Sequence, residues 1–152
     1  IYTSELFTRG APEQRRDIHV GIDLGGPVGA PVTLPCAGVV AFQGYNAAAG
    51  DYGHCVVTRH TLQNQTLYML FGHLDRDSIR HATDVELPAG YVIGRLGDRA
   101  ENGGWPPHLH FQLILDIGSA TGDYPGVCKR SERDRWLSIC PDPRPLLGLA
   151  VA

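Results

Sequence analysis

Short runs of hydrophobic residues, separated by turn residues, recur along most of this 152-residue chain. They lie at 18–24, 31–34, 38–42, 55–60, 66–71, 91–96 and 108–115, and segments such as GGPVGAP, NAAAGDYG and TLQNQ separate them. Apolar runs of this length between Gly-, Pro- and Asn-rich turns are typical of β-strands. The sequence before residue 130 has no long stretch with the 3.6-residue period of an amphipathic helix. The pattern therefore predicts an all-β domain.

The two ends of the chain do not follow this pattern. Residues 1–16 are polar, and we expect them to be irregular. SERDRWLSI predicts a short helix with Ser131 as its N-cap. The Pro-rich CPDPRPLLGLA is expected to run over the surface. We interpret residues 1–152 as one domain, with a core at about 17–115 and a C-terminal tail at 116–152.

Composition narrows the classes of partner. The 19 Gly and 11 Pro suit many short strands joined by turns. The net charge of -3 offers no basic excess, so we expect neither nucleic acid nor an anionic membrane as partner. No apolar stretch approaches the ~20 residues of a membrane span. Because the chain begins at Ile1, we interpret it as an excised or processed piece, and the lack of a signal peptide says little about the parent.

The four cysteines are scattered and form no CxxC pair; they are Cys36, Cys55, Cys128 and Cys140. The preferred interpretation is four ordinary thiols in a reducing compartment. One or two disulfides are the alternative, and the spacing does not rank the pairings.

The run HLHFQLIL has a strict period of two. His108, His110, Gln112 and Ile114 fall on one side, and Leu109, Phe111, Leu113 and Leu115 fall on the other. This period predicts a strand with one apolar face, on which the two imidazoles point the same way. The pair either serves a metal ion or lies on a solvated face, and the run alone favours neither.

A second stretch, HVGIDL, adds a histidine and a carboxylate. His19 and Asp23 are four residues apart, and Gly21 between them disfavours a helix. On a strand they share a face, and Gly21 leaves room for an approach to the backbone. With one histidine of HLH they make a His2Asp set with an open fourth position, which is typical of catalytic zinc. His73 follows an apolar run in a third stretch, GHL.

Taken together, these motifs resemble those of the lysostaphin-type zinc metallopeptidases, which are peptidoglycan endopeptidases. HVGIDLGGPVGAPVTLPCAGVV matches the HxGxD start of that family and its GxPVxAxxxGxV continuation. YGHCVVTRH, LYMLFGHL, VIGRLG and PHLHFQ follow in the order of the family, and the resemblance covers about residues 17–115. It implies a two-sheet antiparallel β assembly.

The resemblance also implies roles for five residues. His19, Asp23 and His110 would bind Zn²⁺. His108 would act as general base, and His73 would stabilise the developing oxyanion or assist proton transfer. The other histidines match no ligand position of the family and are interpreted as facing solvent or packing; they are His54, His60 and His81.

The loop before the HLH strand supplies candidate substrate-binding residues. Trp105, with the two prolines after it, forms either a stiff wall beside that strand or an anchor that fills a hydrophobic gap. Asn102 and Gly103, with Gly104, would let the loop bend close to a substrate backbone.

Two features depart from the family. ENGGWPP replaces a Ser/Thr-Gly-rich turn, and Gln112 replaces the acid of HxHxE. We interpret both changes as bordering the groove without touching a ligand, so the substrate need not be peptidoglycan. The tail resembles a branch in which the domain is fused between a phosphotransferase-like kinase and a class III aminotransferase. That branch implies a cytoplasmic parent, whereas the rest of the family implies the cell envelope.

The sequence therefore predicts a zinc metallopeptidase that hydrolyses a peptide or amide bond, in peptidoglycan or in a small peptide conjugate. The alternative is a non-catalytic, zinc-containing binding or structural module of a multidomain protein. The presence of all five residues favours the enzyme.

Overall fold

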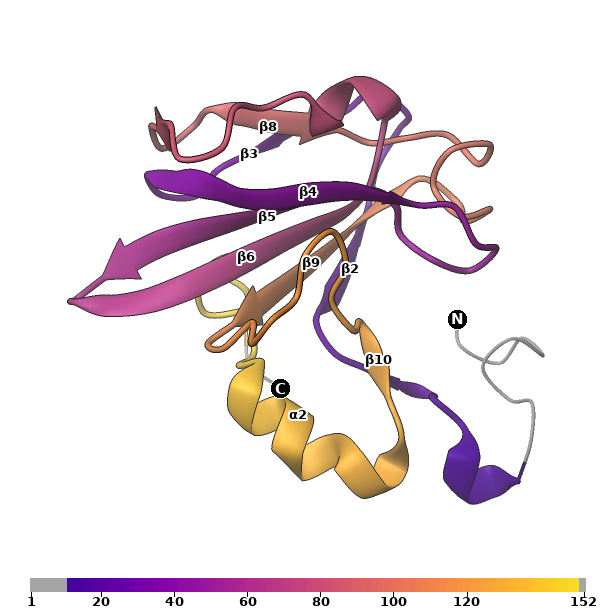
Figure 1. Cartoon of the computed structure of the whole chain (residues 1–152). Coiled ribbons are helices and arrows are strands. Elements are labelled where there is room, and N and C mark those ends of the chain that lie inside the picture. The colour runs from indigo at the N-terminus through magenta and orange to yellow at the C-terminus, as the bar shows by residue number, and fades with distance from the viewer. Residues whose placement is uncertain (1–10, 151–152) are drawn as a thin grey trace.

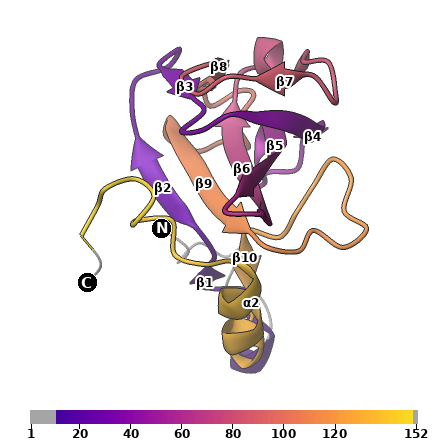
Figure 2. The same ribbon diagram turned by 90° about the vertical axis from the view of Figure 1, so that its left-hand side faces the viewer.

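The computed structural model describes residues 11–150, which form mostly antiparallel β-structure (Figure 1). Six strands make the central sheet in the order β2-β9-β6-β5-β4-β7. Their bounds are β2 Ile22–Gly25, β4 Gly38–Asn46, β5 Gly53–Leu62, β6 Gln65–Leu74, β7 Glu86–Leu87 and β9 His108–Ile114. Figure 2 shows β9 between β2 and β6, so the HLH strand lies one strand from the edge of the sheet.

Two small sheets and the helices complete the architecture. β3 (Pro31–Thr33) pairs with β8 (Val92–Arg95), and β1 (Ile18–His19) pairs with β10 (Val127–Cys128). The helices are the 3-10 turns η1 (Pro12–Gln14), η2 (Arg76–Ile79) and η3 (Arg130–Glu132) and the α-helix α2 (Arg133–Ile139). The predicted all-β fold of antiparallel sheets with a short C-terminal helix is confirmed. Within residues 11–150, no helix has the length and hydrophobicity needed to cross a membrane.

The two faces of the central sheet bury separate hydrophobic clusters. One cluster packs under the β3–β8 layer and includes Phe71, Phe111 and Ile93. The other lies toward β10 and α2 and includes Leu70 and Ile114. The split follows from the period of two, because successive residues of β6 and β9 point to opposite faces. Full burial of a side chain of this size contributes about 1.5–3 kcal/mol.

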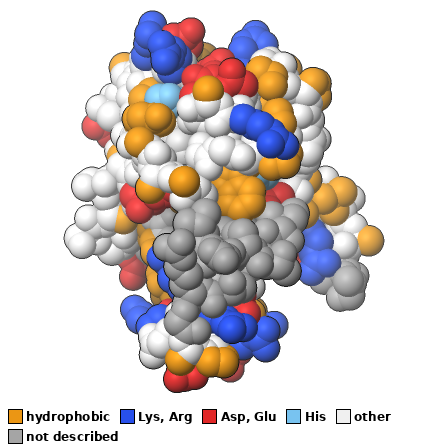
Figure 3. Space-filling view, turned by 90° about the vertical axis from the view of Figure 1, so that its right-hand side faces the viewer, with side chains coloured by type: hydrophobic (Ala, Val, Ile, Leu, Met, Phe, Trp, Pro, Cys, Tyr) orange, Lys and Arg blue, Asp and Glu red, His pale blue; other side chains and the backbone are white. Residues whose placement is uncertain are grey.

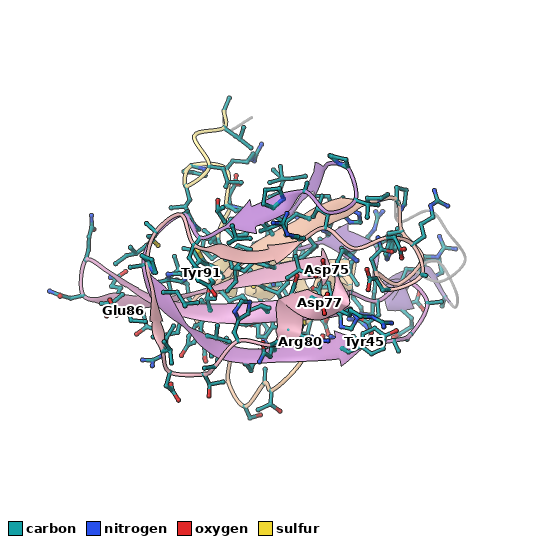
Figure 4. The ribbon with its side chains drawn as sticks, turned by 90° about the horizontal axis from the view of Figure 1, so that it is seen from above. Tyr45, Asp75, Asp77, Arg80, Glu86 and Tyr91 are labelled. Atoms are coloured by element: carbon teal, nitrogen blue, oxygen red, sulfur yellow. The ribbon has the colours of Figure 1, made fainter. Side chains whose placement is uncertain are left out.

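The turn after β6 is fixed by side-chain hydrogen bonds. Asp75 caps η2 by accepting a hydrogen bond from the Ser78 backbone amide at 3.0 Å, and the Arg95 amide donates to Ser78 Oγ at 2.9 Å. Figure 4 labels Asp75 with the exposed Asp77 and Arg80, which form an ion pair at 3.0 Å. These contacts hold the chain just beyond His73.

Charged side chains are mixed on the surface. On the face shown in Figure 3, acidic and basic groups lie among each other. Ion pairs join Arg130 to Asp17 at 3.2 Å and Arg144 to Asp142 at 2.6 Å. This mixing accords with the small net charge of -3.

Several local predictions differ from the structure. The run at 18–24 forms two strands, β1 and β2, because the backbone turns at Gly21. Strands β7 and β10 have two residues each, which is too short to leave a pattern in the sequence. The prediction of Ser131 as N-cap is wrong: the extended backbone ends with β10, so the chain already turns at η3 and α2 begins at Arg133.

The four cysteines are free thiols. Cys55, Cys128 and Cys140 are buried, and Cys36 is half-buried. Burial raises the pKa of each thiol, and that of Cys55 reaches about 12. A thiol that stays protonated is a poor nucleophile, so these side chains act as packing groups.

Candidate metal centre

Three side chains from three strands meet at one end of the central sheet. His19 Nε2 lies 3.2 Å from Asp23 Oδ1, and His110 Nδ1 lies 3.3 Å from the same oxygen. The two imidazole nitrogens are 2.9 Å apart. Asp23 and His110 are cross-strand partners of β2 and β9, and His19 is held by the pairing of β1 with β10.

Gly21 brings His19 and Asp23 together. The expectation that they share the face of one strand is wrong, because β1 ends at His19 and Gly21 has φ 132°. A Cβ at Gly21 would lie 2.9 Å from the Phe111 carbonyl oxygen and 3.1 Å from two atoms of the His110 ring. The glycine therefore leaves room for a close approach, as expected, and the group that approaches is the ring of His110.

The three donor atoms fit a zinc ion. All three lie within 4.8 Å of one another. Zn²⁺ with bonds of about 2.0–2.1 Å in a tetrahedron requires ligand atoms roughly 3.3 Å apart, and the observed separations are 2.9–3.3 Å. Two imidazoles and one carboxylate are also a donor set that zinc prefers, with a position left for water or substrate.

The electrostatics of the site favour ligation. Burial alone would raise the pKa of Asp23, but the imidazoles of His110 and His19, whose nitrogens lie 3.3 and 3.2 Å from Oδ1, outweigh it and hold that pKa well below its usual range. Burial lowers the pKa of His110, which is only 2% exposed. The carboxylate is therefore charged and the imidazole neutral, which are the forms that bind a metal cation.

Gln112 contacts His110, one of the three candidate metal ligands. The interpretation that glutamine in place of the family's acid touches no ligand is therefore wrong. Its Oε1 lies 2.9 Å from His110 Nε2, on the side of the ring away from Asp23. The side chain is fully buried. The interpretation failed because the alternation shows which way Gln112 points and does not show which neighbour it meets.

The backbone fixes the protonation of the His108 ring. His108 Nδ1 lies 2.7 Å from the Pro106 carbonyl oxygen. A carbonyl oxygen only accepts, so Nδ1 donates and Nε2 carries the free lone pair. That Nε2 is 3.7 Å from Asp23 Oδ1, which places it beside the three donor atoms.

His73 is fixed in the same way. Its Nδ1 donates to the Asn102 carbonyl oxygen at 2.8 Å, and its ring centroid lies 4.3 Å from that of His108. The backbone of His73 has φ 63°, which is rare for residues other than glycine. Such strained backbone conformations cluster at functional sites. Burial, followed by the nearby charge of His108, lowers the pKa of His73 to about 3.

The three substrate-binding candidates occupy different positions. Trp105 lines the cleft beside the metal centre, with its ring centroid 6.3 Å from those of His73 and His108. Asn102 is fully buried, and its side chain bonds Gly97 O and the backbone N and O of Trp105. Gly103 packs against the Asp51 backbone, where a Cβ would overlap the carbonyl oxygen. Trp105 is thus a wall of the cleft, while Asn102 and Gly103 shape the loop that carries it.

The cleft contains residues that the sequence did not single out. Tyr52 lies in it, with its hydroxyl 3.5 Å from His110 Nε2, and Asp51 and Asp123 are among the other lining residues. Tyr52 also packs so closely on Gly72 and Gly126 that a Cβ at either would overlap its ring or hydroxyl. Tyr52 stands just before β5 and begins the YGHCVVTRH motif, but that motif does not show that its side chain enters the cleft.

The remaining histidines lie away from the three donor atoms. His54 and His60 are buried within β5, so they pack and do not face solvent. His54 stacks on Tyr45 with ring centroids 4.2 Å apart, and His60 Nε2 lies 2.7 Å from Thr58 Oγ1. His81 Nε2 donates to the Ile93 carbonyl oxygen at 2.7 Å.

The family model described as peptidase family M23 matches residues 17–121, which include all five functional candidates. The chain belongs to peptidase family M23. The match ends before β10 and α2, although β10 pairs with the strand that carries His19.

Relatives of this member of family M23 are considerably longer. It is 32% identical over 108 residues to an L-Ala--D-Glu endopeptidase of Bacillus subtilis. That alignment covers 68% of this chain and 31% of the relative. It is 33% identical over 125 residues to an uncharacterized metalloprotease of Haemophilus influenzae, covering 78% and 24%. The chain thus spans less than a third of these curated relatives.

The fold is also similar to a solved peptidase structure. The catalytic domain of the antimicrobial peptidase lysostaphin from Staphylococcus simulans aligns with a TM-score of 0.59 and 21% identity. The alignment covers 86% of this chain and 79% of that one. It therefore extends beyond residues 17–121 and shows that the M23 fold accounts for most of the chain.

Proposed function

We propose that this M23 domain is a zinc-dependent endopeptidase with His19, Asp23 and His110 as metal ligands. The observation that carries the proposal is the convergence of those three donor atoms with two further imidazoles, His73 and His108, at one end of a sheet. A structural zinc site is usually closed by four protein ligands and rich in cysteine, and this set has neither property.

The two further histidines would handle protons. When bound, zinc supplies Lewis acidity that lowers the pKa of a water molecule to about 7. His108 carries a free lone pair on Nε2, because its Nδ1 is committed to Pro106 O, so it is suited to accept a proton as general base.

His73 is suited to the second of its two expected roles. Its Nδ1–H is committed to Asn102 O, so Nε2 of the neutral ring offers a lone pair. A neutral ring in this form accepts a proton and donates none from Nε2. We therefore assign His73 to proton transfer and not to stabilisation of an oxyanion.

The proposed substrate is a peptide or amide bond of the peptidoglycan type or in a small peptide conjugate. The endopeptidase activity named for the Bacillus subtilis relative supports the peptide class. The exposed Gly104 keeps one rim of the cleft low, and Trp105 supplies a flat apolar wall beside it. We therefore propose small-residue or D-amino-acid peptides as the first substrates to try.

A cleavage assay tests the endopeptidase. Zinc-loaded protein is incubated with muropeptides and a panel of glycine-rich and D-amino-acid peptides, with and without chelator. We expect chelator-sensitive cleavage that His108→Ala abolishes. The alternative is a non-catalytic, zinc-containing module. It would replace the endopeptidase if the protein cleaved nothing yet bound one panel member equally well with and without His108→Ala.

We also propose that the parent protein joins this domain to a phosphotransferase-like kinase and a class III aminotransferase in the cytoplasm. The resemblance of the tail to that branch is the support. An antibody against this domain should detect a band far larger than 16.5 kDa in the cytoplasmic fraction of the source cells. A band in the cell envelope without those domains would reject the proposal.

A further inference from the structure

We propose that Gln112 is a positioning residue that fixes the metal ligand His110 with its proton on Nε2, and that Pro125 and Cys140 of the C-terminal segment orient Gln112. The inference deepens the proposed zinc site and rests on it for the identity of the metal. It concerns this chain in particular, because glutamine stands where the family's HxHxE motif has an acid.

The first step is the orientation of the Gln112 amide. Its Nε2 lies 3.2 Å from the Pro125 carbonyl oxygen and 3.3 Å from Cys140 Sγ. A carbonyl oxygen can only accept, so the amide must place its NH2 group there. Rotating the amide by 180° would set two oxygens against each other in a fully buried site. The NH2 group is thereby committed, and Oε1 faces His110.

The second step follows for the ring of His110. Oε1 accepts only, so the 2.9 Å contact requires a proton on His110 Nε2. A neutral imidazole carries one N–H, so Nδ1 then has a free lone pair. Nδ1 is the atom that lies 3.3 Å from Asp23 Oδ1 and 2.9 Å from His19 Nε2. Gln112 thus turns the correct nitrogen into a metal donor before any metal arrives.

A neighbouring hydroxyl does not set the proton position in place of Gln112. Tyr52 OH lies 3.5 Å from His110 Nε2, which is 0.6 Å longer than the Gln112 contact. A hydroxyl can donate or accept, so it adapts to either form of the ring, whereas the amide oxygen permits one form only.

The third step explains why glutamine suits this chain. A carboxylate in the same place would offer an acceptor to His110, but it has no N–H for Pro125 O. Pro125 and Cys140 both lie beyond residue 121, where the family match ends. The C-terminal segment is therefore part of the metal centre through Gln112. Outer partners of metal-binding histidines typically change metal affinity 10- to 100-fold.

The test reads the proton position and the metal affinity of the whole chain. Long-range proton–nitrogen NMR of metal-free protein at about pH 8, where imidazole is neutral, identifies the protonated nitrogen of His110. Zinc affinity is measured by competition with a chromophoric chelator. The variants are Gln112→Leu and Gln112→Glu. Gln43→Leu is the matched control, because its amide also makes two hydrogen bonds, both part-buried and both with the His81 backbone.

We expect the wild type and Gln43→Leu to show His110 protonated on Nε2 with equal zinc affinity. Gln112→Leu should show a mixture of the two ring forms and about 10- to 100-fold weaker zinc binding. Gln112→Glu keeps an acceptor and should retain the Nε2–H form, while its thermal midpoint falls. Should Gln112→Leu misfold, a mixed ring form in Gln112→Glu would still overturn the proposal.

Two further results would overturn it. One is a Gln112→Leu protein with the Nε2–H form and the zinc affinity of Gln43→Leu, and the other is a wild type protonated on Nδ1. Neither measurement uses a peptide. A wild type that has the expected ring form and binds zinc, but cleaves nothing, would therefore reject the endopeptidase alone.

Discussion

The two faces of the central sheet are equally well buried but differ in what they bury. Under the β3–β8 layer, Phe71 and Phe111 are cross-strand partners with ring centroids 5.3 Å apart, among other apolar side chains. On the opposite face of β9, His110 and Gln112 are 2% and 0% exposed. One face is stabilised by apolar contact, and the other requires a hydrogen-bond partner for each polar atom.

The difference shows what the C-terminal segment contributes. The histidine face does not lie in solvent, because β10, α2 and the residues around Cys140 cover it. Burial of these polar side chains without hydrogen-bond partners would cost much folding free energy. The covering segment supplies Pro125 O and Cys140 Sγ, which accept hydrogen bonds from the Gln112 amide that contacts His110. The predictions below separate the two faces.

The largest effect is expected for the metal ligands. Asp23→Ala should lose zinc, because two protein ligands rarely hold it against competition, and cleavage should fall to background. Elemental analysis after gel filtration measures the loss. His108→Ala should retain about one zinc while turnover falls ~10²- to 10⁴-fold. The surface change Asp77→Ala is the control and should alter neither; retention of zinc by Asp23→Ala would count against the ligand set.

On the apolar face, Phe71→Ala should lower the free energy of unfolding by about 3–5 kcal/mol, because it leaves a cavity beside Phe111. Urea denaturation measures the change. Zinc affinity at temperatures where the variant is folded should be unchanged, since Phe71 points away from the histidines. A loss of zinc from the folded variant would show that the two faces are not independent.

The loop that holds His73 should show an intermediate effect. Asn102→Ala removes three hydrogen bonds and should destabilise the domain by about 1–3 kcal/mol. Turnover should also fall, because a loop without these bonds no longer fixes the Asn102 backbone carbonyl, which orients the His73 ring. Zinc affinity should stay at the wild-type value. The measurement compares the loss of zinc affinity with the loss of turnover in the same variant. Equal losses of both would contradict a role confined to the loop.

The smallest effect concerns His60, on the apolar side of the sheet. Burial lowers its pKa in the folded state below the usual histidine value of 6.5. As the pH falls below about 6.5, the unfolded chain therefore takes up the proton first, so stability present above that pH is lost at up to about 1.4 kcal/mol per pH unit. Denaturation of wild type and His60→Gln at pH values from about 7.5 to 5 should show a shallower fall for the variant. Parallel curves would contradict the assignment.

Most strands of the central sheet were predictable because each carries its own apolar run bounded by turn residues. The 108–115 run appears as β9 with one residue less, and the 55–60 and 66–71 runs lie inside β5 and β6. The five candidate site residues were also recognisable from their order along the chain, and the structure brings all five to one place.

What escaped prediction depends on contacts between distant segments. The alternation of β9 shows that His110 and Gln112 share a face, but the residues that cover the face belong to the tail. The break at Gly21 depends on the ring of His110, which is far along the chain. Asn102 looked like a rim residue because its role is set by the path of the loop back to Gly97 and Trp105.

The pairing of β1 with β10 has a consequence for how the protein is made. His19 lies in a two-residue strand whose partner, at Val127–Cys128, is synthesised more than a hundred residues later. His110 likewise receives its amide support only when Cys140 is in place. While this segment is still inside the ribosome, a nascent chain already contains the ligands His19 and Asp23. It still lacks β10 and the residues around Cys140 that align the site. The centre therefore assembles after translation of the domain, and no shorter nascent chain presents it complete.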